Sequence, residues 1–355
     1  MVDRLFARHE KALIERTVVG LLDEGIGVRL LVPRSGFKHR TSWETPVERT
    51  PYVDRGVSIM LPIRARSLAQ TLREQAPDTS WDIVHAFGGQ TWPLALELAR
   101  RFDAALVLEL WRLGLVSRAQ SIVRSGSVEV MCLVPDQSFI DAIEREGVDI
   151  PVRVATWGVP SPISPREVLS DDGGVSIVFH SGGRDRVACV TAFDGVADAV
   201  REHPETHLFI NIEASQRAGL WERARGAGIL DRVTMVDQIE HQRDLALSAD
   251  IYIDPDTVHE HRSMLLEALA NGLVVVSADE EQSSAVRDGE TAVIVRDLTP
   301  AAWTGAVAGI LGDREHARRI GQQAWSYVRE HRKLSTHIGS TIDAYAQVTG
   351  QTVGA

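Results

Sequence analysis

The 355-residue chain contains only two cysteines, Cys132 and Cys189. Two cysteines without a C-x-x-C spacing form neither a disulfide framework nor a zinc motif, so we expect two buried thiols. The chain also lacks a run of 18 apolar residues and a charged-then-apolar amino terminus. These absences argue against a membrane span and an export signal, and they predict a cytoplasmic protein.

Positive charge is scarce as well. The chain has 38 Lys and Arg against 49 Asp and Glu, a formal net charge of -11. Duplex nucleic acid and anionic membranes are bound through excess cation, so we expect neither as the main partner. A local basic pocket for a phosphorylated small molecule is compatible with this balance. The basic residues are almost all arginine, which suits two-point contacts to phosphate or carboxylate.

Short runs of Val, Ile and Leu alternate with helical segments along the chain. The stretch SPISPREVLSDDGG, residues 161–174, is the best candidate for a linker between a first and a second series. Apolar strands separated by helices predict parallel sheets covered on both faces. The length allows two hydrophobic cores. We therefore predict an α/β protein with two doubly wound domains, residues 1–160 and 161–330, followed by a helix in 331–355.

One charged residue stands out within an apolar segment. In DPDTVHEHRSMLLEALANGLVVV, residues 254–276, Glu267 lies inside a predicted helix that begins near Ser263. Such a helix follows a strand, so its first amides face the ligand crevice of a parallel sheet. Glu267 would lie one turn further on the same face, where a carboxylate can accept hydrogen bonds from a ribose diol. The alternative is an exposed glutamate that merely favours helix.

The residues before this helix also permit simpler interpretations. Thr257 and Glu260 have the spacing of a capping box. Asp254, His259, Glu260 and His261 could suggest a metal site. However, HEH lacks the i, i+4 histidine spacing of a zinc helix, so we predict no metal and a solvated loop instead.

The run MLLEALANGLVVVSADEEQSSAVRDGETAVIV, residues 264–295, resembles the retaining nucleotide-sugar glycosyltransferases of family 4. SIVFHSGGR, GILDRVTMVDQI, DIVHAF and RVATWGVPSPISP resemble further segments of that family. The resemblance implies a GT-B fold, in which two Rossmann-like domains face a cleft and the final helix packs back on the first domain. The first domain would serve the acceptor, and the second would bind a nucleoside diphosphate sugar.

The resemblance also assigns roles to individual residues. Glu267 would hold the ribose, and the helix start at Ser263, Met264 and Leu265 would contact the diphosphate. Arg184 would neutralise the leaving diphosphate, while Gly182 and Gly183 let the backbone approach it. His85 would lie near the acceptor. A lone histidine at a strand end is otherwise more often structural.

Two positions depart from the family pattern. The first glutamate of the motif, which would touch the donor sugar, falls on His259. The lysine expected five residues after Arg184 falls on Cys189, and losing one such cation costs about 3 kcal/mol in leaving-group stabilisation. We expect Arg186 to supply the missing charge, and Glu260 to replace the glutamate if the loop slips by one residue.

The amino terminus departs too. FARHEKALIERTVVGLLDEGIGVRLLVP resembles the family's first helix and second strand, so only MVDRLFA precedes them and the first strand has scarcely any room. Our hypothesis is that Met1 is either a mis-chosen start inside that strand or a genuine shortening. The first sheet has then lost a central strand or builds it from MVDRLF.

The predicted function is transfer of a sugar from a UDP or GDP sugar to an acceptor hydroxyl with retained configuration. No cofactor or metal is expected, because helix dipole and guanidinium offset the leaving charge. The acceptor is a glycan, a lipid-linked molecule or a small molecule, and a homo-oligomer stays open. Two alternatives are a catalytically impaired scaffold protein and a nucleotide-sugar epimerase that uses residues around His85 and Glu109.

Overall fold

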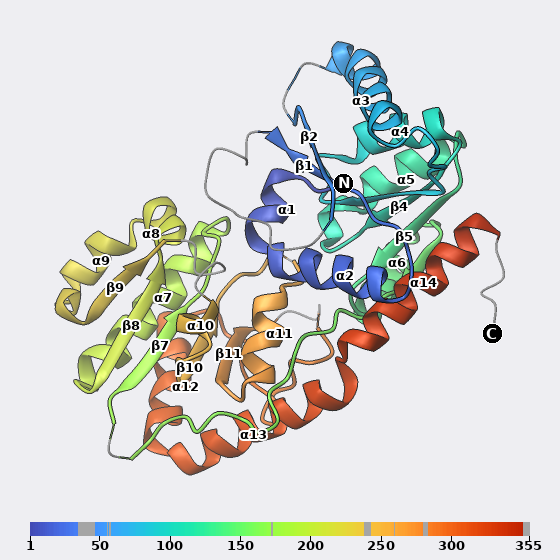
Figure 1. The fold of residues 1–355 in the computed structure, drawn as a ribbon. Coiled ribbons are helices and arrows are strands. Elements are labelled where there is room, and N and C mark those ends of the chain that lie inside the picture. The colour runs from blue at the N-terminus through green and yellow to red at the C-terminus, as the bar shows by residue number, and fades with distance from the viewer. Residues whose placement is uncertain are drawn as a thin grey trace. The chain divides into compact units, whose positions relative to one another are not determined.

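The computed structural model describes residues 1–34, 47–54, 56, 58–171, 173–237, 243–258, 260–279 and 283–350. Its fold is GT-B, with parallel sheets in two Rossmann-like domains, which confirms the predicted fold class. The chain divides into unit 1, Met1–Gly158 with Leu334–Ala355, and unit 2, Val159–Lys333 (Figure 1). Within the described residues, no helix has the length and hydropathy that crossing a bilayer requires.

Unit 2 is built around a parallel sheet of six strands in the order β12-β11-β10-β7-β8-β9. Strands β8 and β9 extend the sheet on one side of β7, and β10 to β12 extend it on the other side. The carboxyl ends of β7 and β10 therefore form a topological switch point, the usual ligand position in such sheets. The strands are β7 (Val175–Phe179), β8 (Thr206–Asn211), β9 (Val233–Val236), β10 (Ile251–Asp254), β11 (Val274–Ala278) and β12 (Val293–Val295).

Helices cover this sheet. α12 packs against α7, and α13 packs against α11 and β11. Phe179 of β7 meets Phe193 of α7 edge to face at 5.9 Å, and both rings belong to one continuous core with Trp303 of α12. The helices are α7 (Arg186–Glu202), α8 (Ile212–Ala218), α9 (Leu220–Gly226), the 3-10 helix η4 (Leu230–Arg232), α10 (Arg243–Ala246), α11 (Ser263–Ala270), α12 (Pro300–Gly312) and α13 (Arg314–His331).

The middle of the candidate linker, residues 161–174, packs on the core of unit 2. Val168 and Leu169 are buried in the core of unit 2, and the Leu169 amide donates to the Asp250 carboxylate at 2.8 Å. The abundance of Ser, Pro, Asp and Gly in residues 161–174 indicates irregular backbone, but it does not prevent two apolar side chains from packing on a neighbouring sheet.

Unit 1 contains two parallel sheets, β1-β2 and β3-β4-β5-β6. His85, predicted to lie at a strand end, is two residues before the end of β3 at Phe87. The strands are β1 (Leu30–Pro33), β2 (Arg49–Tyr52), β3 (Ile83–Phe87), β4 (Ala105–Glu109), β5 (Val130–Val134) and β6 (Val152–Val154).

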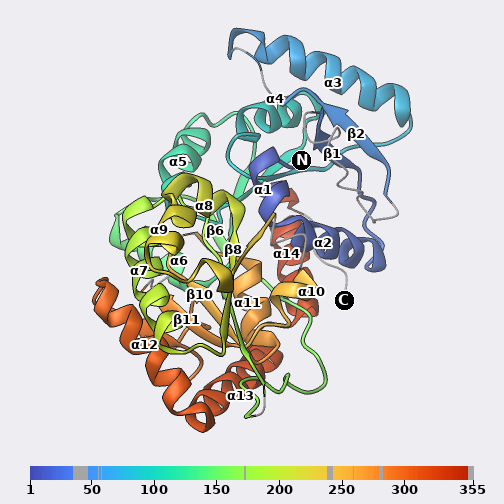
Figure 2. The same cartoon turned by 90° about the vertical axis from the view of Figure 1, so that its left-hand side faces the viewer.

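The final helix of the chain belongs to unit 1, where it contacts α2, β4 and β5. Figures 1 and 2 both show this helix, α14, beside α2, although almost the whole chain separates them in sequence. The helices are α1 (Arg4–His9), α2 (Lys11–Asp23), the 3-10 helix η2 (Ser58–Met60), α3 (Leu61–Gln75), α4 (Trp92–Phe102), the 3-10 helix η3 (Leu113–Leu115), α5 (Val116–Arg124), α6 (Gln137–Arg145) and α14 (Leu334–Thr349).

Residues 1–3 lie between β1 and β3. The Val2 amide donates to Leu31 at 3.0 Å, and the Asp3 amide donates to Phe87 at 2.8 Å. The Phe87 amide donates back to Met1 at 2.8 Å. Val2 thus pairs with Phe87 as a parallel bridge, so the first residues of MVDRLF provide a short strand segment between the two sheets.

Candidate functional site

The switch point of unit 2 brings together two loops that are far apart in sequence. One follows β7 and contains the predicted Gly182, Gly183 and Arg184; the other follows β10. Asp256 joins them, because its carboxylate accepts from the Gly182 amide at 3.0 Å and from the Ser181 hydroxyl at 2.5 Å. The Gly182 amide, predicted to face the diphosphate, therefore already donates to an acid of this chain.

Gly183 has a structural reason to be glycine. Its φ of +63° lies in the left-handed region, and an added Cβ would come within 3.1 Å of the Ala214 Cα. At Gly182 the nearest atom to an added Cβ is 3.8 Å away, which is an ordinary contact. The two glycines of the loop therefore differ: the backbone conformation requires one of them, and local space would admit a side chain at the other.

Glu267 is buried at 3 % exposure in helix α11, all of whose residues are buried. Its Oε2 accepts from the Nε of Arg243 at 2.7 Å, and Nη2 of the same guanidinium donates to the Ser263 hydroxyl at 2.8 Å. The alternative of an exposed, helix-favouring glutamate is wrong. A carboxylate buried this deeply needs a cation or several donors, and Arg243 provides the cation.

The start of α11 differs from that of α7. Helix α7 is capped by Asp185, whose carboxylate accepts from the Ala188 amide at 3.0 Å. Helix α11 begins at Ser263 as predicted, and its N-cap residue Arg262 makes no capping hydrogen bond. The Arg262 side chain thus does not cap α11, and the helix dipole makes this end attractive to an anion.

Glu260 lies beside the same helix start. Its carboxylate pairs with both Arg184 and Arg262, and the glutamate is 7 % exposed. The capping-box interpretation is wrong, because the Thr257 hydroxyl donates instead to Asp185 and residues 257 and 258 are not helical. His259 lies outside the described residues. Among the residues that are described, no three metal-capable side chains form a group.

The two positions expected to carry a second cation have different environments. Cys189 is fully buried in the core of unit 2, and burial raises the pKa of its thiol to about 12. Arg186 is the first residue of α7 and is exposed. Nearby, burial raises the pKa of Asp254 to about 7, and the charge of Asp256 adds to this shift. The cations held close to α11 are instead Arg243 and Arg262.

His85 lies in unit 1, in strand β3. Its Nδ1 is 2.7 Å from the Tyr345 hydroxyl, and its Nε2 is 3.1 Å from Oε2 of Glu109. The other oxygen of Glu109 accepts from Nε1 of Trp157 at 2.7 Å. Burial lowers the pKa of His85, while the hydrogen bond and charge of Glu109 act in the opposite direction.

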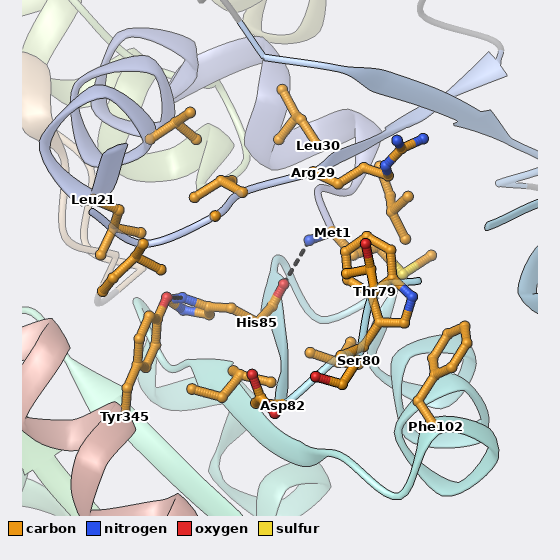
Figure 3. A pocket seen from close by; sticks show the side chains of 18 of the residues that line it. Met1, Leu21, Arg29, Leu30, Thr79, Ser80, Asp82, His85, Phe102 and Tyr345 are labelled. Carbon is orange, nitrogen blue, oxygen red and sulfur yellow. Dashed lines mark hydrogen bonds between the residues drawn. The ribbon is translucent and has the colours of Figure 1, made fainter. Parts of the chain in front are cut away.

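A cavity of about 820 Å³ opens beside His85 (Figure 3). Leu30 of β1 and Ile83 of β3 also line it, and the Met1 amine donates to the His85 carbonyl oxygen at 2.5 Å. Its walls are mainly apolar, with Leu21 and Phe102 among them.

The lowered pKa of His85 predicts a pH dependence of stability. Above its ordinary pKa of 6.5 the ring is neutral in both states; below it, the unfolded ring gains a proton that the folded ring resists. The free energy of unfolding should therefore fall between pH 7.5 and pH 5.5, and His85→Gln should make the decrease smaller. Denaturant titrations at both pH values check this. An identical decrease in the variant and the wild type would contradict it.

Sequence reasoning missed two residues of the site. Arg262 directly precedes the predicted helix start, so its position was an available signal. Arg243 lies 24 residues before Glu267, in a short helix with no recognisable motif, and only the folded chain brings the two together.

Comparisons with known proteins find similarity to glycosyltransferases. Residues 183–313 match the family model described as Glycosyl transferases group 1. The D-inositol 3-phosphate glycosyltransferase of Nocardia farcinica is 36% identical over 108 residues, which are 30% of this chain and 24% of that protein. Glycogen synthase of Mycobacterium tuberculosis is 26% identical over 288 residues, 71% of this chain and 66% of that protein.

Among solved structures, Anabaena HepE in complex with UDP and glucose has a TM-score of 0.69 at 12% identity and covers 95% of both chains. This likeness concerns the fold alone. The present chain spans about a quarter of the length of the first curated relative and about two thirds of the second. Together, the family match and the relatives support a glycosyltransferase.

Proposed function

We propose that this protein transfers a sugar from a nucleoside diphosphate sugar to an acceptor hydroxyl. The observation that carries the proposal is the start of α11 at the switch point of unit 2. There the first turn of the helix lies beside Arg184, Arg243 and Arg262, and a buried acid follows one turn later. Helix amides and guanidinium groups suit a diphosphate, and a buried carboxylate suits the hydroxyls of a ribose.

In this proposal Glu267 accepts hydrogen bonds from the ribose, and the amides of Met264 and Leu265 bind the diphosphate together with Ser263. Arg184 offsets the charge that develops on the leaving diphosphate, which is where electrostatic stabilisation lowers a transition state most. Its ion pair with Glu260 holds the guanidinium beside α11. Glu260 replaces the first glutamate of the motif in facing the donor sugar.

The chemistry we propose retains the anomeric configuration and requires neither a metal nor a cofactor. Arginines and the α11 dipole supply the positive charge that a divalent cation would otherwise bring. UDP sugars are the first donors to test, because HepE was solved with UDP and glucose. His85 stays a predicted acceptor-side residue, with its ring already held by Glu109 and Tyr345.

A second candidate function is a nucleotide-sugar-binding scaffold without transfer activity. It is favoured by Cys189, since a fully buried thiol stands where a catalytic cation is expected. Donor hydrolysis separates the two candidates. An enzyme slowly releases free nucleoside diphosphate from its donor, whereas a scaffold binds the donor and leaves it intact.

Nucleotide binding should be visible as thermal stabilisation. A ligand at a hundred times its Kd stabilises the folded state by about 2.7 kcal/mol, which for a domain the size of unit 2 raises Tm by about 5 °C or more. We expect such a shift with one of UDP, GDP and ADP or their sugars, and chromatography of the same mixtures reports released diphosphate. If millimolar amounts of every member of the panel left Tm unchanged, the proposed function would be wrong.

A further inference from the structure

Arg243 connects the two residues of α11 that the proposed function uses at different parts of the donor. We propose that it is a positioning residue: it neutralises Glu267 and fixes Glu267 and Ser263 so that the ribose and the diphosphate can bind side by side. This inference rests on the proposed function and adds to it a determinant of selectivity for phosphorylated over unphosphorylated ligands.

The two hydrogen bonds of Arg243 support its role as a positioning residue. Nε contacts Glu267 at 2.7 Å and Nη2 contacts Ser263 at 2.8 Å, so one planar group holds side chains that are one helical turn apart. A guanidinium presents its donors in a fixed fork, and two simultaneous contacts restrict the rotamers of both partners. The Arg243 side chain is 15% exposed and that of Glu267 is 4% exposed, so little water competes for these bonds.

The charge of Arg243 supports the proposed selectivity for phosphorylated over unphosphorylated ligands. Without Arg243, the negative charge of Glu267 would lie one turn, about 6 Å, from the helix terminus where the diphosphate binds. Two like charges at that separation in a poorly solvated site repel each other strongly enough to weaken binding by about tenfold or more. A nucleoside without phosphate would not feel this repulsion. The ratio of nucleoside Kd to nucleoside diphosphate Kd therefore measures what the guanidinium contributes through charge.

Charge and geometry can be separated by substitution. Arg243→Lys keeps the charge but offers a single point donor in place of the fork. Arg243→Gln removes the charge and keeps an amide of similar reach. Glu267→Gln removes the negative charge that Arg243 neutralises, so in the double variant Arg243→Gln, Glu267→Gln the repulsion is absent again.

The experiment measures the Kd of UDP and of uridine by calorimetry for the full chain and these variants. We expect Arg243→Gln to weaken UDP binding about tenfold or more and uridine binding less than threefold. Arg243→Lys should retain most of the wild-type ratio with a moderate loss of affinity for both ligands. Adding Glu267→Gln to Arg243→Gln should restore the ratio, although both ligands then bind more weakly through the lost ribose contact.

Arg223→Gln is the matched control, because Arg223 pairs with Asp194 on an exposed surface of unit 2 and should change neither Kd. If wild-type protein binds UDP and Arg243→Gln lowers UDP and uridine affinity equally, Arg243 has only a structural role and the inference is wrong. The same holds if the double variant fails to restore the ratio. Failure of wild-type protein to bind any nucleoside diphosphate would instead contradict the proposed function itself.

Discussion

Replacing Glu267 by alanine removes the nucleotide-dependent thermal shift. The carboxylate is proposed to accept hydrogen bonds from the ribose, and hydrogen bonds to a charged group contribute about 1.5–3 kcal/mol each. Loss of two such bonds weakens nucleotide binding by at least about a hundredfold. Because Arg243 also loses its buried partner, ligand-free protein should unfold about 3 kcal/mol more easily.

Binding and stability have to be read separately in this test. Calorimetric titration below the unfolding transition gives the Kd, and denaturant unfolding without nucleotide gives the stability. Glu267→Gln keeps the side-chain shape and should lose less stability than alanine while still binding poorly. Glu222→Ala, an exposed glutamate of α9, is the matched control. Wild-type nucleotide affinity in Glu267→Ala would contradict the ribose assignment and with it the proposed donor site.

Gly195→Ala should destabilise unit 2 by about 3 kcal/mol or more. An added Cβ would lie 2.2 Å from the Pro300 carbonyl oxygen and 2.6 Å from the Trp303 Cβ, where α7 crosses α12. The Pro300 carbonyl oxygen is a backbone atom of α12, and the Trp303 Cβ is bonded directly to that backbone. Neither atom can therefore move away by side-chain rotation. Alanine is otherwise the better helix former by about 1 kcal/mol, so only the packing makes this substitution unfavourable.

Gly309→Ala in α12 is the matched control for this helix crossing. Gly309 is exposed, and an added Cβ there meets no atom within 4 Å. Gly309→Ala should leave the free energy of unfolding unchanged or raise it by up to about 1 kcal/mol. Urea denaturation of both variants and wild type gives the comparison. Equal stability of Gly195→Ala and wild type would show that the two helices do not approach this closely.

The sequence correctly predicts those helix starts and strands that depend on residues close to one another along the chain. The start of α11 at Ser263 follows from a polar residue before an apolar periodic run, and the strands follow from short runs of Val, Ile and Leu. The capping box at Thr257 and Glu260 had equally good spacing and was wrong. Thr257 instead donates a hydrogen bond to Asp185, and Glu260 forms an ion pair with Arg184. Both partners are more than 70 residues away, so no local pattern includes them.

By itself the sequence determined the fold class, the alternation of strand and helix and the position of Glu267 within an apolar helix, because hydrophobic periodicity and helix starts depend on neighbouring residues. Only the tertiary structure decided which cations accompany the acids: Arg243 for Glu267, and Arg184 with Arg262 for Glu260. It also decided that Val2 pairs with Phe87 of β3 as a parallel bridge. The physical reason is that ion pairs and sheet registers join segments whose separation along the chain carries no periodic signal.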